Sequence, residues 1–387
     1  MHLVEDLIAT GHQVTVLTAQ PSYTGATAQA PPTERTHPNL LVRRFTLLPE
    51  SRKLGLARLA NSLIFPSRVV LAGMMLRDVD VVMAATAPPI LAGQAASILA
   101  VRHRAAFVYH NQDIYPEVAV AAGLITRPAV ARILRFLDRQ NHRRATKTVV
   151  LSQDMKETVQ ARGIPADRIE IINNFDPFGA ADLPEPHDVD LNPNSPLRVA
   201  FTGNLGRFQG LEVVMDAAKL LRELPMVTLD LVGDGALRAQ LETVVNRQKL
   251  SNVRLHGYRP PDEVEHYLTN QADVGIVSTA PGVIRAAYPS KTFSYLRSGC
   301  ALIALVEPDS ELARTIGAQG VGIVCDPGDS LGLADAIRLV AADRALLSRM
   351  RSRARAFGSK ASAPSQCLAT WNAMFTELID SRDGARE

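Results

Sequence analysis

A glycine-rich stretch at residues 201–210, FTGNLGRFQG, has residue types suited to a chemical task. It follows an apolar, β-prone run and precedes a segment of helical period, so we expect a strand, a tight turn and a helix. Such a turn directs free backbone N–H groups and the positive end of a helix dipole at one point, where an anion can bind. Gly203 and Gly206 would allow close approach and unusual φ values, and Arg207 could pair with a phosphate. Glycines that only shape a tight turn are the plainer alternative.

A second stretch, YHNQDIYPE at residues 109–117, places proton-transfer groups at the end of an expected strand. In open α/β sheets, ligands bind at the carboxyl ends of the strands. His110 and Asp113 are therefore candidate catalytic residues, because a neutral imidazole or a carboxylate can take up a proton near neutral pH. Glu117 is interpreted equally well as a first-turn helix residue that complements the helix dipole.

Both stretches belong to runs of short β-prone segments that alternate with segments of helical period. The first run contains the expected strands HQVTVLT, LLVRRF, DVDVVMA, AAFVYH, TKTVVLS and RIEIINN. The second contains LRVAFTG, VTLDLVGDG, NVRLHG, ADVGIVS, CALIALV and GVGIVC. This alternation predicts an α/β protein of two Rossmann-like, doubly wound domains, at residues 1–176 and 197–363, joined by a proline-rich linker at 177–196.

Composition excludes several other classes of protein. With 387 residues, of which 47% are hydrophobic and 21% charged, the chain is typical of a globular protein with two cores. A net charge of +3 is too weak to indicate a nucleic-acid partner. Cys300, Cys325 and Cys367 are widely spaced and suggest neither disulfides nor a metal site, which fits a reducing cytoplasm. The longest apolar stretch is too short and too broken to span a bilayer.

Several longer blocks occur in a familiar order. In the second half they are LVGDGALRAQLE from 231, HGYRPPDEVEHYLTNQADVGIVS from 256 and YPSKTFSYLRSGCALIALVEPDSELARTIGAQGVGIVCDPGD from 288. In the first half they are GHQVTVLTAQPSY from 11, ATAPPILAG from 85 and YHNQDIYPEVAVAAGLI from 109. Over almost its whole length, the chain resembles family 4 glycosyltransferases of the GT-B fold. It is similar to the bacterial branch that builds surface polysaccharides on lipid carriers.

This resemblance implies a nucleotide sugar, usually a UDP-sugar, bound in the second domain and an acceptor in the first, on either side of a cleft. It also implies transfer with retained anomeric configuration and without a bound metal or cofactor. Protein groups must then neutralise the departing diphosphate. The donor-binding candidates lie in the glycine-rich turn and in the block from 288. They are Gly203, Asn204, Gly206, Arg207, Gln209, Lys291 and Ser294.

The same resemblance assigns roles in the first domain and shows where this chain departs from the family. His110 would line the acceptor side beside the reacting sugar carbon, and Asp113 would position or deprotonate the acceptor hydroxyl. Many relatives carry Arg and Lys at positions 204 and 209, so Arg207 would take over part of that charge. A glutamate pair eight positions apart in the family reads Ala286 and Ser294 here, which leaves Ser294 at most one ribose contact.

The resemblance further implies a hexose or N-acetylhexosamine donor and a lipid-linked or polysaccharide acceptor. Basic residues around the apolar segment 54–76 fit an anionic membrane surface, which would make the protein peripheral on the inner face of the plasma membrane. These residues are Arg43, Arg44, Arg52, Lys53, Arg58 and Arg68. The alternative is two ordinary core helices that meet at Pro66.

The two ends of the sequence raise separate expectations. The chain begins inside the helix that precedes GHQVTVLT, so the first strand of the relatives' sheet is missing. We expect either a true start upstream of Met1, which we favour, or a degraded copy. At the other end, the helix 364–380 would pack back on the first domain, with Trp371 in the core. Two further readings of function are a nucleotide-sugar 2-epimerase on the same fold and a catalytically silent nucleotide-sugar-binding protein.

Overall fold

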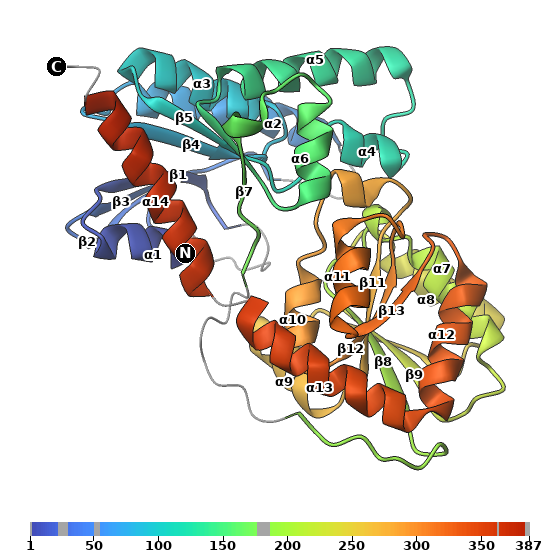
Figure 1. Ribbon diagram of the computed structural model, residues 1–387. Helices are drawn as coiled ribbons and strands as arrows, with labels where there is room; N and C mark the ends of the chain where they lie inside the picture. Colours follow the sequence, from blue (N-terminus) through green and yellow to red (C-terminus); the bar gives the residue numbers. More distant parts are fainter. Residues whose placement is uncertain (1, 22–29, 50–54, 176–185, 362–363, 384–387) are drawn as a thin grey trace.

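The chain forms two α/β halves, shown in Figure 1 with the N-terminal half above and the C-terminal half below. The computed structural model describes residues 2–21, 30–49, 55–175, 186–361 and 364–383. Two parts of the sequence-based prediction lie outside these ranges. They are Arg52 and Lys53 of the expected basic surface, and residues 177–185 of the expected linker.

The C-terminal half is built on one continuous parallel sheet of six strands in the order β10-β9-β8-β11-β12-β13. Alternate side chains of each strand enter cores on the two faces of this sheet. Val199 and Phe201 of β8 enter one core, whereas Ala200 enters the other. The strands are β8 Leu197–Thr202, β9 Val227–Val232, β10 Val253–Gly257, β11 Val274–Ser278, β12 Ala301–Leu305 and β13 Gly322–Cys325.

Helices follow these strands and cover both faces, as expected for a doubly wound sheet. They are α7 Leu211–Leu220, α8 Arg238–Gln248, α9 Pro261–Asn270, α10 Lys291–Arg297, α11 Glu311–Gln319, α12 Ser330–Ala342 and α13 Arg344–Ala361. Two short 3₁₀ helices, η2 Arg207–Gln209 and η3 Val283–Arg285, lie at the carboxyl ends of β8 and β11. The expected strands of this half are all present.

The N-terminal half has its strands in two sheets rather than one. The order β1-β3-β2 forms a three-stranded sheet, and β4-β5-β6-β7 forms a parallel four-stranded sheet. In the described part of the chain, β1 and β4 each pair with a strand on one side only. The strands are β1 Val14–Ala19, β2 Thr33–His37, β3 Leu40–Phe45, β4 Val81–Ala85, β5 Ala106–His110, β6 Lys147–Val150 and β7 Ile169–Ile171.

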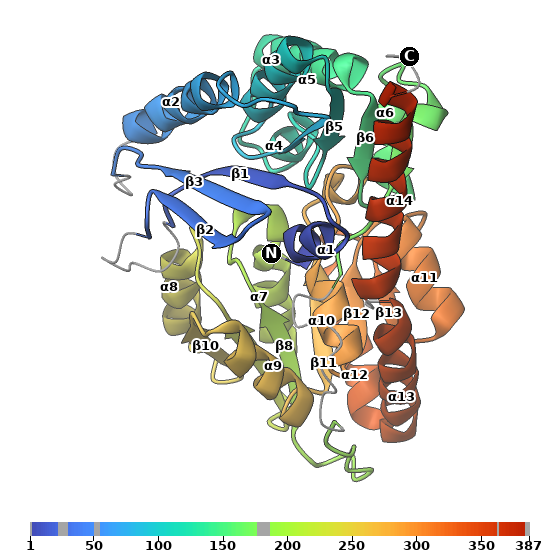
Figure 2. The same ribbon diagram turned by 90° about the vertical axis from the view of Figure 1, so that its left-hand side faces the viewer.

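Three helices of this half lie side by side in one layer, in which α3 and α5 cover the four-stranded sheet and α2 packs on α3 and β1, and the others lie around it (Figures 1 and 2). The layer contains α2 Gly55–Gly73, α3 Leu91–His103 and α5 Pro128–Arg144, and the others are α1 His2–Ala9, α4 Glu117–Ala121, α6 Gln153–Gln160 and η1 Ala166–Arg168. Pro66 lies inside α2, so the boundary expected there as an alternative is wrong. A proline removes one helical hydrogen bond, and α2 nevertheless continues to Gly73, which packs against Leu99 of α3.

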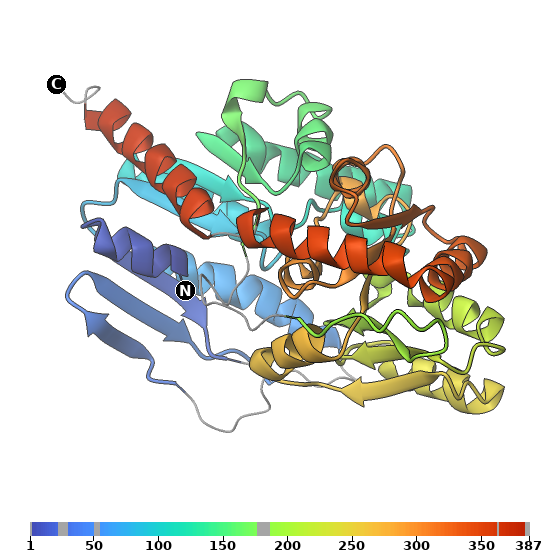
Figure 3. The same cartoon turned by 60° about the horizontal axis from the view of Figure 1, so that its bottom comes forward.

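The last helix, α14 Pro364–Asp383, belongs to the N-terminal half in space (Figure 3). Trp371 is buried with Phe375 in a core that includes Val108 of β5 and Val149 of β6. Arg382 near the end of α14 forms an ion pair with Asp80, with 2.6 Å between Nη1 and Oδ1. Figure 3 shows α13 and α14 following each other along one side of the molecule, so the chain crosses from one half back to the other.

Candidate functional site

The glycine-rich turn follows β8 and packs closely against the turn that follows β9. Gly203 has a φ of 105°, and a Cβ placed on Gly233 would lie 1.8 Å from the carbonyl oxygen of Gly203. Only glycine allows these two strand ends to approach so closely. The unusual φ expected at Gly206 is wrong, because its φ is −106°, which is extended backbone. The left-handed residue is Gly210, which separates η2 from α7.

The turn brings Gln209 and Lys291 together, although they are far apart in the sequence. Lys291 Nζ donates to Gln209 Oε1 at 2.8 Å and lies 3.5 Å from the centre of the Phe201 ring. Desolvation in this position lowers the pKa of Lys291 to about 7. Lys291 lies against an aromatic ring and has no carboxylate partner among the described residues, an arrangement that suits an incoming anion.

The other expected donor-binding residues surround this pair less tightly. Arg207 and Asn204 are exposed, and the Arg207 guanidinium contacts no partner among the described residues. Ser294 lies one turn beyond Lys291 in α10 and is half-buried. The structure therefore places one half-buried basic group, Lys291, and one exposed basic group, Arg207, on the same side of the C-terminal sheet.

Two buried hydroxyl groups near this turn were not predicted. Ser278 ends β11, and a Cβ on Gly210 would lie 3.5 Å from its Oγ. Thr292 follows Lys291 directly. Neither hydroxyl has a hydrogen-bond partner in the described part of the chain. The position of Ser278 at the carboxyl end of an apolar strand was the signal that could have identified it.

His110 ends β5 on the face of the sheet that α14 covers. Phe107 and Tyr109 enter the core under α3, so the two-residue period of the strand turns Val108 and His110 toward α14. The His110 ring makes an edge contact with Trp371, 5.0 Å between ring centres. The lone pair of His110 Nε2 accepts from Gln112 Nε2 at 2.8 Å in the neutral tautomer with hydrogen on Nδ1. Desolvation lowers the pKa of His110 to about 4, so the ring is neutral near pH 7.

Asp113 is the free carboxylate of this segment. It is half-buried, and its side chain forms no hydrogen bond or ion pair that joins it to another described residue. Burial raises the pKa of Asp113 above its ordinary value, which makes the carboxylate a better proton acceptor than one in water. Glu117 has a different position, because it opens α4 and pairs with Arg135 and Arg162.

The two halves meet where these stretches lie. Ile114 N donates to Ala286 O at 2.7 Å, and Asp113 forms an antiparallel bridge with Ala287. Ile114 and Val118 share an apolar cluster with Ala286 from the C-terminal half. The Ala286 methyl group is fully buried in this cluster, so position 286 cannot contact a nucleotide here. Asp113 is thus paired with Ala287, which precedes Lys291 by four positions in the sequence.

Polar groups also connect the halves. Asp154 Oδ2 in the first turn of α6 accepts from Glu311 N at 2.8 Å, and Glu311 accepts from Gln153 N in return. Each carboxylate therefore satisfies the N-terminus of the opposite helix. Arg285 of η3 bonds Asp154 at 3.0 Å and Asp309 at 2.5 Å. These contacts fix α6 of the N-terminal half against α11 of the C-terminal half.

Comparison with known proteins identifies the class. A family model described as "Glycosyl transferase 4-like domain" matches residues 1–174, and one described as "Glycosyl transferases group 1" matches residues 196–343. Together these matches cover most of the chain. The chain is a glycosyltransferase of the GT-B fold. It belongs to the family 4 glycosyltransferases, as the sequence resemblance predicted.

Two curated relatives support this family assignment. WbjE of Pseudomonas aeruginosa, named as a glycosyltransferase, is 26% identical over 290 residues, which cover 72% of this chain and 70% of WbjE. WcaI of Escherichia coli K12, a glycosyl transferase named for colanic acid biosynthesis, is 26% identical over 356 residues. These cover 87% of this chain and 86% of WcaI.

Solved structures share the fold. Anabaena HepE in complex with UDP has a TM-score of 0.63 and 21% identity, with 88% of this chain and 86% of HepE covered. Sucrose-phosphate synthase from Thermosynechococcus elongatus has a TM-score of 0.74 and 18% identity, with 98% and 92% covered. Across the described residues, no helix of the chain is long and apolar enough to cross a bilayer.

Proposed function

We propose that the chain is a retaining, metal-independent glycosyltransferase that moves a hexose or N-acetylhexosamine from a UDP-sugar to a lipid-linked or polysaccharide acceptor. The observation that carries this proposal is the backbone pairing of Asp113 and Ile114 with Ala286 and Ala287. It joins a free carboxylate, suited to take the acceptor proton, to the segment that leads into Lys291. UDP and UDP-glucose are bound by HepE, a solved structure of the same fold, which supports the choice of donor.

In this mechanism the C-terminal half holds the diphosphate. The departing UDP needs positive charge, which would come from Lys291, Arg207 and the N–H groups of the glycine-rich turn. No metal ion is then required in that role. Lys291 would exchange its bond to Gln209 for one to a phosphate oxygen. Ser278 and Thr292 hold buried hydroxyl groups that could donate to the same ligand.

The N-terminal half handles the acceptor. Asp113 would accept or orient the acceptor hydroxyl proton, and its raised pKa favours that role. His110 stays neutral and is held by Gln112 and Trp371, so it would shape the pocket beside the sugar rather than carry a charge. We propose no metal and no cofactor for either half.

The acceptor class is supported by the surface of the N-terminal half. The layer α2, α3 and α5 carries a single carboxylate, Asp138, and that side chain is buried. Large apolar side chains are exposed on all three helices: Leu56, Leu59, Leu63, Leu71, Ile98, Val101, Val130, Ile133 and Phe136. Exposed arginines accompany them: Arg58, Arg68, Arg102, Arg132, Arg143 and Arg144, whereas Arg135 pairs with Glu117. Apolar and cationic groups without exposed anions suit an anionic lipid surface, which supports a peripheral location on the cytoplasmic face of a membrane.

This surface differs from the one expected from sequence. Arg43 and Arg44 lie on β3, and Arg44 pairs with Glu34 at 2.6 Å rather than joining the helical layer. Arg52 and Lys53 lie outside the described residues. Helices α3 and α5 were not part of the expectation, because their arginines are spread through ordinary amphipathic sequence.

The test is a transfer assay with UDP-glucose and UDP-N-acetylglucosamine as donors and a short-chain polyprenyl diphospho-sugar as acceptor, with and without EDTA. We expect UDP release, an α-linked product by NMR from these α-linked donors, and no effect of EDTA. Asp113→Asn should lower turnover by about 100-fold or more, whereas the affinity for UDP should change little. Asp262→Asn on exposed α9 is the matched control. UDP release with an epimerised free sugar, or UDP-sugar binding without turnover, would reject the proposal.

A further inference from the structure

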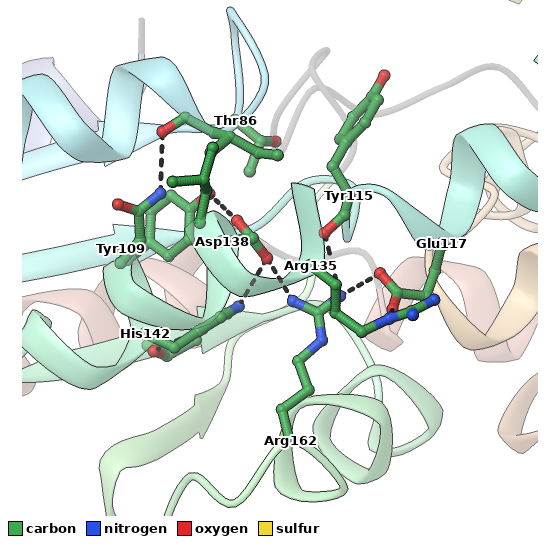
Figure 4. A network of polar contacts seen from close by, with 12 residues as sticks. Thr86, Tyr109, Tyr115, Glu117, Arg135, Asp138, His142 and Arg162 are labelled. Carbon is green, nitrogen blue, oxygen red and sulfur yellow. Dashed lines mark hydrogen bonds and ion pairs between the residues drawn. The ribbon is translucent and has the colours of Figure 1, made fainter. Parts of the chain in front are cut away.

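A buried polar network lies directly behind the acceptor segment. Asp138 of α5 is fully buried and accepts from Tyr109 OH at 2.7 Å (Figure 4). Its other oxygen contacts His142 Nε2 at 3.2 Å and accepts from Arg162 Nη1. Burial alone would raise the pKa of Asp138, but the contacts with His142 and Arg162 outweigh it and hold the pKa below its ordinary value. Asp138 is therefore an anion inside the domain.

Arg162 extends this network to the acceptor segment. Its Nη2 donates to the Tyr115 carbonyl oxygen at 3.0 Å and to Glu117. Glu117 also accepts from Arg135 Nε at 2.8 Å at the protein surface. Figure 4 shows the Arg162 guanidinium between Asp138 on one side and Tyr115 and Glu117 on the other. One planar cation thus links a buried carboxylate to two positions just after Asp113.

The segment held in this way lies between the two halves. Ile114 pairs with Ala286, Val118 lies in the shared apolar cluster, and α4 contacts both η2 and η3. Because η2 contains Arg207 and Gln209 of the expected donor site, α4 touches the donor turn on one face. Residues 114–121 are defined here as the wedge. Tyr109, which bonds Asp138, and its neighbour His110 lie at the end of β5, a few residues before the wedge.

We propose that Arg162 is a positioning residue for sugar transfer, which anchors the wedge to Asp138 and so sets the distance from Asp113 to the donor turn. This inference rests on the proposed function, since it concerns the placement of the same groups. Arg162 contacts no reacting atom and acts through Tyr115 and Glu117. A displacement of about 1 Å between reacting groups can cost about 100-fold in rate, so loss of this anchor should reduce turnover more than nucleotide binding.

The test compares four variants with the unmodified chain. Arg162→Met removes the anchor and leaves Asp138 with Tyr109 and His142 but without its guanidinium partner, which should also lower stability. The double variant Asp138→Asn with Arg162→Met removes the buried charge and should recover much of the lost Tm. Arg162→Lys keeps the positive charge but replaces the planar guanidinium with one ammonium nitrogen, which cannot span Asp138 and the wedge in the same way. Arg135→Met removes the surface partner of the same Glu117 and serves as the matched control.

We expect kcat to fall about tenfold or more in Arg162→Met and in the double variant, with KM for the UDP-sugar changed by less than about threefold. Arg162→Lys should recover part of kcat, and Arg135→Met should stay within about twofold of the unmodified chain. If kcat recovers together with Tm in the double variant, Arg162 is only a structural residue and the inference is wrong.

A second readout does not depend on activity. Hydrogen exchange of the wedge amides should be faster in both Arg162→Met and the double variant, and unchanged in Arg135→Met. Unchanged wedge exchange in the double variant overturns the inference. If the unmodified chain transfers no sugar, the proposed function fails, and the exchange experiment still decides whether Arg162 holds the wedge.

Discussion

The two halves of the molecule are both α/β, but their sheets differ in how far the strands are buried and paired. Every residue of β11 and β12 in the C-terminal sheet is buried. In β1 and β4 of the N-terminal half no residue is fully buried, and Met83 of β4 is 36% exposed. The C-terminal strands form one sheet of six strands, whereas β1 and β4 each lack a strand partner on one side within the described residues.

The difference teaches where each half obtains its rigidity. Parallel sheets are stable when both faces and both strand edges are covered, which the central C-terminal strands achieve. That half carries the groups that we propose for diphosphate binding, and such groups need fixed positions to neutralise charge. The acceptor segment of the N-terminal half is held instead by the opposite half, by α14 and by Arg162. Four predictions test this contrast.

The largest effect should come from Lys291 in the rigid half. Lys291→Met should lower kcat/KM for the UDP-sugar by about 100-fold to 1,000-fold, because a preorganised charge for the diphosphate is lost. Since the pKa of Lys291 is about 7 in the free protein, UDP affinity should fall as pH rises above 7, and the variant should lose this dependence. Isothermal titration with UDP between pH 6 and 8.5 measures both. Lys219→Met, on the exposed face of α7, is the control.

The same pKa predicts a change in stability with a definite sign. An unfolded lysine has a pKa of about 10.4, so between pH 7 and that value the unfolded chain binds more protons than the folded one. The free energy of unfolding should therefore rise across this window through Lys291, and Lys291→Met should flatten the rise. Equal slopes in the two proteins would mean that Lys291 is not desolvated.

The next effect compares the two sheets with one substitution. Leu229→Ala in β9, where the side chain is 1% exposed, should cost about 2–5 kcal/mol of unfolding free energy through the cavity it leaves. Leu17→Ala in β1, where the side chain is half-buried, should cost about 1 kcal/mol or less. Urea unfolding followed by hydrogen exchange in each sheet separates the two costs. Similar values would show that the N-terminal sheet is as well covered as the C-terminal one.

The smallest effect concerns the outer surfaces. Ile133→Ser with Phe136→Ser on α5, where the side chains are 61% and 60% exposed, should reduce binding to phosphatidylglycerol vesicles by about tenfold. Leu331→Ser with Leu339→Ser on α12 changes two exposed leucines of the other half and should have no effect. Sedimentation with vesicles measures the bound fraction. Equal loss in both pairs, or no binding by the unmodified chain, would remove the membrane from the proposed function.

Most of the fold could be predicted because buried parallel strands appear in a sequence as short apolar runs. The expected strands LLVRRF and AAFVYH match β3 and β5 closely. Strand β2 was missed, because TERTH is polar and exposed and has no apolar period. Such an edge strand is specified by its pairing with β3, which local sequence does not reveal.

The site was predicted as separate stretches rather than as an arrangement. Gly203, His110 and Asp113 follow from stretches at strand ends and Lys291 from the resemblance of the block from 288, and their roles stay predictions. The bond between Gln209 and Lys291 depends on the distance between two turns in space. Position 286 lies in an apolar cluster that forms only when both halves are present. Arg162 gave no signal, because an arginine at the end of an amphipathic helix is ordinary in sequence.

The contact between His110 and Trp371 has a consequence for synthesis of the protein on the ribosome. Trp371 lies in α14, so the residue that packs against the His110 ring is translated long after His110. A nascent chain in which all three sheets have formed still lacks this contact. Under the proposed function, such an intermediate would have its diphosphate-binding half complete while its acceptor half still waits for α14.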